Sequence, residues 1–150
     1  MIYTKLTTNA MKIAFEAHRD QTDISGVPYI YHPIHLAEQC DNEYDICVAL
    51  LHDVMEDCDE QYKDKIYEEF PQEVITALEL LNHKKKKLPY MEYIKEIKND
   101  IIATKIKILD LKHNLDSSRI INVEVYDEKK KEKLLKKREL YKQALEFLMK

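Results

Sequence analysis

An adjacent histidine and aspartate, His52 and Asp53, stand where an apolar stretch of the sequence becomes acidic. An imidazole nitrogen and a carboxylate are both ligands for divalent metals. Glu56 and Asp57 follow at the i+3 and i+4 spacings that make neighbours on a helix. These two carboxylates can hold or deprotonate a water molecule. Two further ligands are needed to complete such a metal site, and the rest of the chain must supply them.

His32 is a candidate for one of the missing ligands. It lies between a loop and Pro33, a residue that suits the first turn of a helix. We therefore expect His32 at a fixed and accessible position. A histidine that only caps the helix is the alternative interpretation.

Asp110 is a candidate for the other ligand, because it interrupts the most apolar helical segment of the chain. A buried carboxylate is unfavourable unless it is paired or bound to a metal. A salt bridge to Lys107 or Lys112 is the alternative. Asn114 and Ser117 share the helix face of Asp110, and a polar stripe on a buried helix is typical of a cavity wall.

The elements that must position these residues are predicted to be helices. The chain has 150 residues, a length that fits one domain, with 45% hydrophobic and 35% charged residues. A single glycine and four prolines argue against a turn-rich β protein. Apolar periodicity predicts helices over residues 5–20, 33–40, 43–57, 60–69, 71–83, 89–98, 101–116 and 127–149.

Charge and composition exclude several classes of partner. The net charge of −4 gives no field that attracts nucleic acid or a membrane surface, and no apolar run approaches the ~20 residues of a membrane span. No signal peptide opens the chain, and three cysteines without a CxxC spacing indicate reduced thiols in a cytoplasmic protein. The lysines at 84–87 and the charged run at 129–138 are expected to be solvated. Phosphate binding by the first run and nucleic-acid binding by the second are the alternatives.

His32, the pair His52-Asp53, and Asp110 occur in an order that resembles the metal site of HD domains. Three surrounding blocks, AHRDQ…SGVPYIYHP, ALLHDVMEDCD and KIKILDLKHNLDSSR, are similar to the hydrolase domain of the RelA/SpoT family and to small alarmone hydrolases. The similarity covers about residues 8–120, and the tail resembles the closing helix of these domains. An HD dipeptide alone is a weak signal, whereas three blocks in order are specific.

The resemblance implies an all-α fold, the HD-domain helical bundle, as a single domain over residues 1–150 with a closing helix at 127–149. It implies one divalent metal, Mn²⁺ in characterised relatives, although two imidazoles and two carboxylates also suit Fe²⁺ or Zn²⁺. The implied ligands are His32, His52, Asp53 and Asp110. The implied activity is hydrolysis of the 3′-pyrophosphate of (p)ppGpp, which gives GDP or GTP and pyrophosphate. Glu56 and Asp57 match the pair that positions or activates the attacking water, and Asn114 and Ser117 match nucleotide contacts.

The first loop departs from the family pattern. Asp23 and Ile24 stand where the family has an Arg-Lys pair whose arginine packs on the guanine base. A carboxylate cannot replace a guanidinium stacked on a base. Leu111 likewise stands where an arginine commonly follows the aspartate. The basic residues that remain as phosphate partners are Arg19, Lys105, Lys112 and Arg119.

Four functions are therefore compared. The first is a Mn²⁺-dependent pyrophosphohydrolase of (p)ppGpp, and the second is a phosphohydrolase of another nucleotide, which the altered loop favours. The third is a non-catalytic nucleotide-binding module, and the fourth is a structural helical bundle. The presence of all four ligand residues together with Glu56 and Asp57 argues against the last two. The sequence gives no indication of the oligomeric state.

Overall fold

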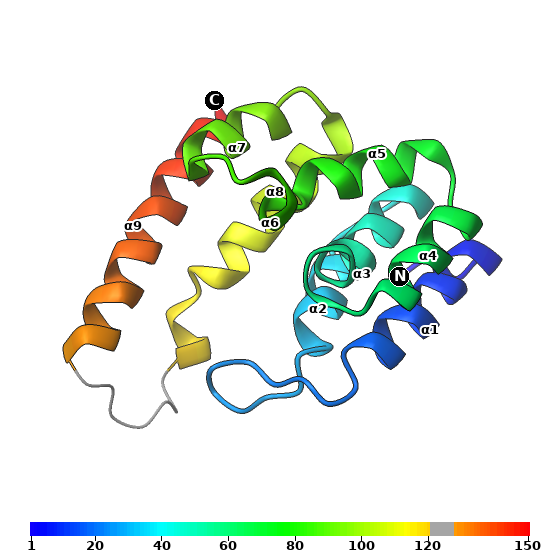
Figure 1. Ribbon diagram of the computed structural model, residues 1–150, viewed down its shortest axis with the longest axis horizontal. Helices are drawn as coiled ribbons and strands as arrows, with labels where there is room; N and C mark the ends of the chain where they lie inside the picture. Colours follow the sequence, from blue (N-terminus) through cyan, green and yellow to red (C-terminus); the bar gives the residue numbers. More distant parts are fainter. Residues whose placement is uncertain (121–127) are drawn as a thin grey trace.

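The computed structural model describes residues 1–120 and 128–150, which form a bundle of α-helices (Figure 1). The helices in chain order are α1 (Lys5–Ala17), α2 (Tyr31–Glu38), α3 (Glu43–Asp57), α4 (Glu60–Glu69), α5 (Gln72–Leu81), α6 (His83–Lys86), α7 (Tyr90–Ile97), α8 (Ile101–Asn114), the short 3₁₀ helix η1 (Ser117–Ile120) and α9 (Glu128–Met149). Within the described ranges, the β-type pairing is one isolated bridge between Thr22 and Pro28. The all-α prediction is confirmed.

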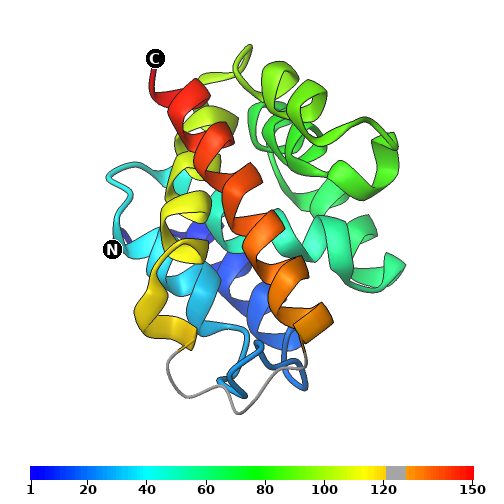
Figure 2. The ribbon, with the colours of Figure 1, turned by 90° about the vertical axis from the view of Figure 1, so that its left-hand side faces the viewer.

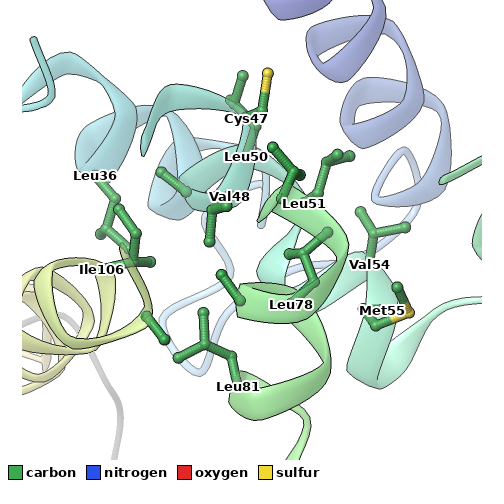
Figure 3. Close-up of a cluster of buried hydrophobic side chains, with 14 of the residues drawn as sticks. Leu36, Cys47, Val48, Leu50, Leu51, Val54, Met55, Leu78, Leu81 and Ile106 are labelled. Carbon is green, nitrogen blue, oxygen red and sulfur yellow. The ribbon is translucent and has the colours of Figure 1, made fainter. Parts of the chain in front are cut away.

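Helix α3 forms the centre of the bundle and packs against α1, α2, α5 and α8. All its residues from 45 to 52 are buried, as expected for a helix that is covered on every side. Asn42 caps its start, because the side-chain oxygen accepts the backbone N–H of Asp45 at 3.0 Å. Figure 3 shows the leucines of α3 meeting Leu78 of α5 in the core. The residues near the end of α3 are therefore held by close packing.

The last helix, α9, covers one side of the bundle. It packs against α7 and α8, and Figure 2 shows it running beside α8. Ala144 and Leu148 are its buried contacts. The closing helix was expected over 127–149; α9 spans Glu128–Met149, and residue 127 lies outside the described residues. Across 1–120 and 128–150, every helix is too short or too polar to cross a membrane.

The loop between α1 and α2 is held by its own hydrogen bonds. The Asp23 carboxylate accepts the backbone N–H groups of Ser25 at 2.8 Å and Val27 at 3.0 Å. Gly26 has φ of +82°, a conformation that glycine adopts without strain. The backbone N–H of Tyr29 then donates to Gln21 at 2.8 Å. The folded loop thereby delivers residues 29–32 to the start of α2.

Candidate metal centre and active site

The four predicted metal ligands come from three helices that pack against one another. His32 lies in the first turn of α2, His52 and Asp53 lie in the last two turns of α3, and Asp110 lies near the end of α8. Each of these helices contacts the other two. The fold therefore brings together His32 and Asp110, which are 78 residues apart in the sequence.

The donor atoms of these residues gather at one place. One ligand atom from each of His32, His52 and Asp53 lies within 4.8 Å of the other two. Nε2 of His32 lies 2.9 Å from Oδ1 of Asp110 and 3.7 Å from Oδ2 of Asp53. Nε2 of His52 lies 3.1 Å from the same Asp53 oxygen and 3.7 Å from the same Asp110 oxygen. Two imidazoles and two carboxylates thus face a common point.

Three of these residues are almost completely buried: His32 is 3% exposed, His52 is 6% and Asp110 is 5%. The expectation that His32 would be accessible is therefore wrong. Its helix begins at Tyr31 and packs its first turns against α3 and α8, so the side chain enters the bundle. Its position at the start of a helix is fixed, as expected, but the packing of the helices covers the side chain.

The two carboxylates of the cluster favour a positive charge at its centre. Burial raises the pKa of Asp110, but the Lys107 ammonium 2.8 Å away and the two imidazoles outweigh it and hold this pKa well below its usual range. Burial lowers the pKa of His52, but Asp53 and Asp110 raise it well above the usual value. Two carboxylates that remain ionised inside the protein need protons on the imidazoles or a bound cation.

The His52 imidazole fits a metal ligand in its detailed hydrogen bonding. Nδ1 lies 2.7 Å from the carbonyl oxygen of Ala49, which can only accept, so Nδ1 carries the proton. In the neutral imidazole, the form that binds a cation, Nε2 then keeps its lone pair. This nitrogen is buried and has no hydrogen-bond partner within residues 1–120 and 128–150. A buried imidazole lone pair beside two carboxylates is a suitable environment for a divalent cation.

Asp110 has two further partners on its own helix. Lys107 donates to Oδ2 at 2.8 Å, and Asn114 donates its side-chain N–H to Oδ1 at 3.0 Å. The salt bridge to Lys107 that was considered as an alternative to metal binding is thus present, but it uses one oxygen. The other oxygen faces the two imidazoles. The ion pair and a metal-ligand role are therefore compatible.

Two residues that support the ligands were not identified from the sequence. The Tyr29 hydroxyl donates to Oδ2 of Asp53, and burial together with this carboxylate raises the pKa of Tyr29, which keeps the hydroxyl protonated. Nδ1 of His113 lies 2.7 Å from Nδ1 of His32. Burial and the nearby Arg119 lower the pKa of His113 to about 4, so its ring is neutral near pH 7. Their sequence signals were weak: Tyr29 lies in the SGVPYIYHP block, and His113 lies one helical turn from Asp110.

Glu56 and Asp57 lie at the end of α3, beside the cluster, and are contacted by α6. Oε2 of Glu56 accepts the backbone N–H of His83 at 3.2 Å, and Asp57 forms an ion pair with Lys84. Burial raises the pKa of Glu56, and the neighbouring Asp57 and Asp53 add to this, although the His83 N–H opposes it. Part of the lysine run is thus a helical turn and not a loop; Lys84 is exposed, as expected, and also pairs with Asp57 at the site.

A cavity of about 730 Å³ opens over the cluster. His52, Asp53, Glu56, Asp57 and Asp110 are among its lining residues; its cationic members are Lys84, Lys107, Arg119, Lys137 and Arg138. The expected solvated face of α9 therefore contributes two cations to the cavity wall. Of the four basic residues predicted as phosphate partners, Arg119 is the one that lines the cavity. Arg19 pairs instead with Glu16, and Lys105 pairs with Asp45.

The two predicted nucleotide contacts are placed differently. Asn114 lines the cavity, and its side-chain oxygen accepts from Arg119 at 3.1 Å. Ser117 is exposed and does not line the cavity; its hydroxyl lies 3.2 Å from Arg138, which does. The structure thus brings Asn114 to the predicted ligands and leaves Ser117 at the edge of the site.

The altered first loop also borders the cavity through Thr22, Asp23 and Ile24. Oδ2 of Asp23 lies 3.8 Å from the Arg119 guanidinium, and its other oxygen is occupied by the loop backbone. Ile24 is 59% exposed. A carboxylate and an apolar side chain therefore occupy the positions where the family pattern has two cations.

Comparisons with known proteins agree with this geometry. The chain is 32% identical over 124 residues to the bifunctional (p)ppGpp synthase/hydrolase SpoT of Escherichia coli K12, a match that covers 74% of this chain. It is 33% identical over 136 residues, 85% of this chain, to the guanosine-3′,5′-bis(diphosphate) 3′-pyrophosphohydrolase of Aquifex aeolicus. The resemblance to the RelA/SpoT hydrolases is confirmed. The chain spans less than a fifth of the length of these curated relatives, 18% and 19%.

A solved structure shows the same fold. It is described as a metazoan ortholog of SpoT that hydrolyzes ppGpp, and it superposes on this chain with a TM-score of 0.75 over 97% of this chain and 88% of its own. The identity of 20% makes this a similarity of fold. No protein-family model matches the sequence. The chain thus has the helical fold of the SpoT hydrolase domain, with a His/Asp cluster suited to a metal.

Proposed function

We propose that this chain is a metal-dependent pyrophosphohydrolase that removes the 3′-pyrophosphate of (p)ppGpp and leaves GDP or GTP. The observation that carries the proposal is the convergence of His32, His52, Asp53 and Asp110 beside a cavity that Glu56 and Asp57 also line. The names of the Escherichia coli and Aquifex aeolicus relatives and the reported ppGpp hydrolysis by the structural neighbour support the choice of substrate.

One divalent cation would be held by the two imidazole Nε2 atoms and by the carboxylates of Asp53 and Asp110. Mn²⁺ is the proposed ion, and Fe²⁺ and Zn²⁺ share its compatibility with nitrogen and oxygen donors. The chemistry that such a cation supplies when bound is polarisation of the phosphoryl oxygen and a lower pKa for water.

The chain's own residues transfer the proton and position the attacking water. Glu56 accepts the proton of the attacking water, a role for which its raised pKa is suitable, and Asp57 holds this water through the carboxylate oxygen that does not pair with Lys84. The water oxygen forms a bond to phosphorus, the bond from phosphorus to the 3′ oxygen breaks, and that oxygen takes up the proton that Glu56 received from the water. Pyrophosphate and GDP or GTP are the products.

The cavity walls support binding of a nucleotide with several phosphates. Arg119, Lys137 and Arg138 add cations to the lining of the cavity, where they can balance phosphate charge. Asn114, and Ser117 together with its partner Arg138, are the proposed contacts to the nucleoside. The substrate is a small molecule, and this role requires neither nucleic acid nor a membrane.

A second candidate, hydrolysis of a different nucleotide, is favoured by the first loop. Asp23 faces Arg119 and organises the loop backbone, so it cannot act as the stacked cation that guanine recognition in the family uses. The same metal centre would then act on a phosphate ester with another base.

Product analysis by anion-exchange chromatography tests the proposal. Purified protein with Mn²⁺ is given ppGpp, pppGpp, GTP, ATP and NADPH in separate reactions, with Asp53→Ala in parallel. We expect GDP and pyrophosphate from ppGpp, and no product from the variant. Turnover of another nucleotide alone would establish the second candidate, and absence of all turnover by metal-loaded protein would contradict both.

A further inference from the structure

His113 lies behind the proposed metal centre and is joined to it through His32. The Nδ1 atoms of the two rings are 2.7 Å apart, and the rings are almost parallel, with an interplanar angle of 3°. One hydrogen lies between two nitrogens at this distance, so one ring donates and the other accepts. The bond links α8 to the first turn of α2.

The other side of His32 determines which ring donates. Nε2 of His32 points to the cluster, 2.9 Å from Asp110. A neutral imidazole that offers Nε2 to a cation carries its hydrogen on Nδ1. His32 therefore donates, and Nδ1 of His113 accepts.

His113 lies outside the cavity that is proposed to bind the substrate. His113 does not line the large cavity; it lines a second one of about 430 Å³ with His35, Glu38 and other residues. His35 stacks on the His113 ring at 4.1 Å, and the His113 carbonyl oxygen accepts from Arg119 at 3.1 Å. The His113 ring thus lies on the Nδ1 side of His32, outside the cavity proposed for the substrate.

We infer that His113 is a positioning residue of the metal centre, which accepts the Nδ1 hydrogen of His32 and thereby fixes the tautomer and orientation of this ligand. The inference rests on the proposed metal centre. Outer partners of histidine ligands typically change metal affinity by about 10- to 100-fold. The effect would be on metal binding, whatever nucleotide is the substrate.

The test measures Mn²⁺ affinity by isothermal titration calorimetry, with circular dichroism to verify folding. His113→Leu removes the acceptor and should weaken Mn²⁺ binding by about 10- to 100-fold. His113→Gln keeps an acceptor oxygen and should restore part of the affinity. The matched control, His35→Gln, alters the same histidine stack without touching His32 and should bind like the wild type.

Equal affinity of His113→Leu and wild type would overturn the inference while leaving the metal centre intact. A wild-type protein that binds no Mn²⁺ would overturn the metal centre and this inference together. A measurement without variants gives an independent result: ¹⁵N NMR of the Zn²⁺-loaded protein should show the His32 hydrogen on Nδ1. A hydrogen on Nε2 would contradict the inference.

Discussion

The proposed metal side and the proposed nucleotide side of the site are built in different ways. On the metal side, His32, His52 and Asp110 are buried on packed helices, and each has a further partner that fixes it. On the nucleotide side, polar and charged side chains from a loop, η1 and α9 contact one another in pairs. Arg119 approaches Asp23 at 3.8 Å, and Arg138 reaches Ser117 at 3.2 Å.

This difference indicates which properties of the site are fixed. Moving a buried ligand requires repacking of three helices, whereas a surface ion pair contributes roughly 0–1 kcal/mol and can change with little effect on the fold. Substitutions at the metal side should therefore cause large losses of activity. Substitutions at the nucleotide side should cause only small shifts in substrate preference.

The largest effect on turnover with the metal retained is expected at Glu56. Glu56→Gln removes the proposed proton acceptor but keeps the shape, so kcat should fall by about 10²- to 10⁴-fold. Mn²⁺ affinity, measured by calorimetry, should remain close to that of the wild type. Glu68→Gln, an exposed glutamate on α4, is the control and should leave kcat unchanged. A wild-type kcat in Glu56→Gln would exclude this residue as the base.

The pH dependence follows from the same carboxylate. Burial and the neighbouring carboxylates raise the pKa of Glu56, and a general base acts only when it is deprotonated. Activity should therefore be lost as the pH falls through this raised pKa, at a higher pH than for an ordinary glutamate. The acid limb of the kcat/KM profile should be missing in Glu56→Gln.

An intermediate effect is expected at Tyr29, whose hydroxyl holds Asp53. Tyr29→Phe removes this donor without changing the ring, and Mn²⁺ affinity should fall by about 10-fold. Tyr31→Phe changes an exposed tyrosine two residues away and serves as the matched control. Identical affinities of the two variants would show that the hydroxyl does not support the ligand.

The smallest effect is expected at the pair of Asp23 and Arg119. Asp23→Asn retains a side-chain oxygen for the backbone N–H groups of the loop but removes the charge that faces Arg119. KM for an anionic nucleotide should fall by about two- to five-fold with kcat unchanged, as expected for the loss of one charge from a long, partly exposed ion pair. Steady-state kinetics measure both constants, and Asp20→Asn, at an exposed position before the loop, is the control. A fall in kcat would contradict the proposed difference between the metal side and the nucleotide side.

The metal side was predictable because its residues follow local rules. An acidic helix end at residues 52–57, a histidine before Pro33 and a carboxylate inside an apolar helix are each visible over a few residues. The resemblance predicted that these residues form one site, and their geometry agrees with this prediction. The partners behind them were not visible, because the bonds from Tyr29 to Asp53 and from His113 to His32 depend on tertiary packing.

The nucleotide side was less predictable because charge runs are normally solvated. Lys84 and Lys137 belong to runs in which every lysine has the same local context, and the fold alone determines which of them faces the cavity. In the sequence, Asp23 is notable only because it stands where the family pattern has an arginine. In the structure it is the residue that ties the loop together and approaches Arg119.

The most direct test of the metal centre is anomalous diffraction at the manganese edge from crystals grown with Mn²⁺. We predict one anomalous peak, coordinated by Nε2 of His32, Nε2 of His52 and the carboxylates of Asp53 and Asp110. The same crystals of Asp53→Ala should lack the peak. A peak at other residues, or one that persists in the variant, would contradict the assignment of these four ligands.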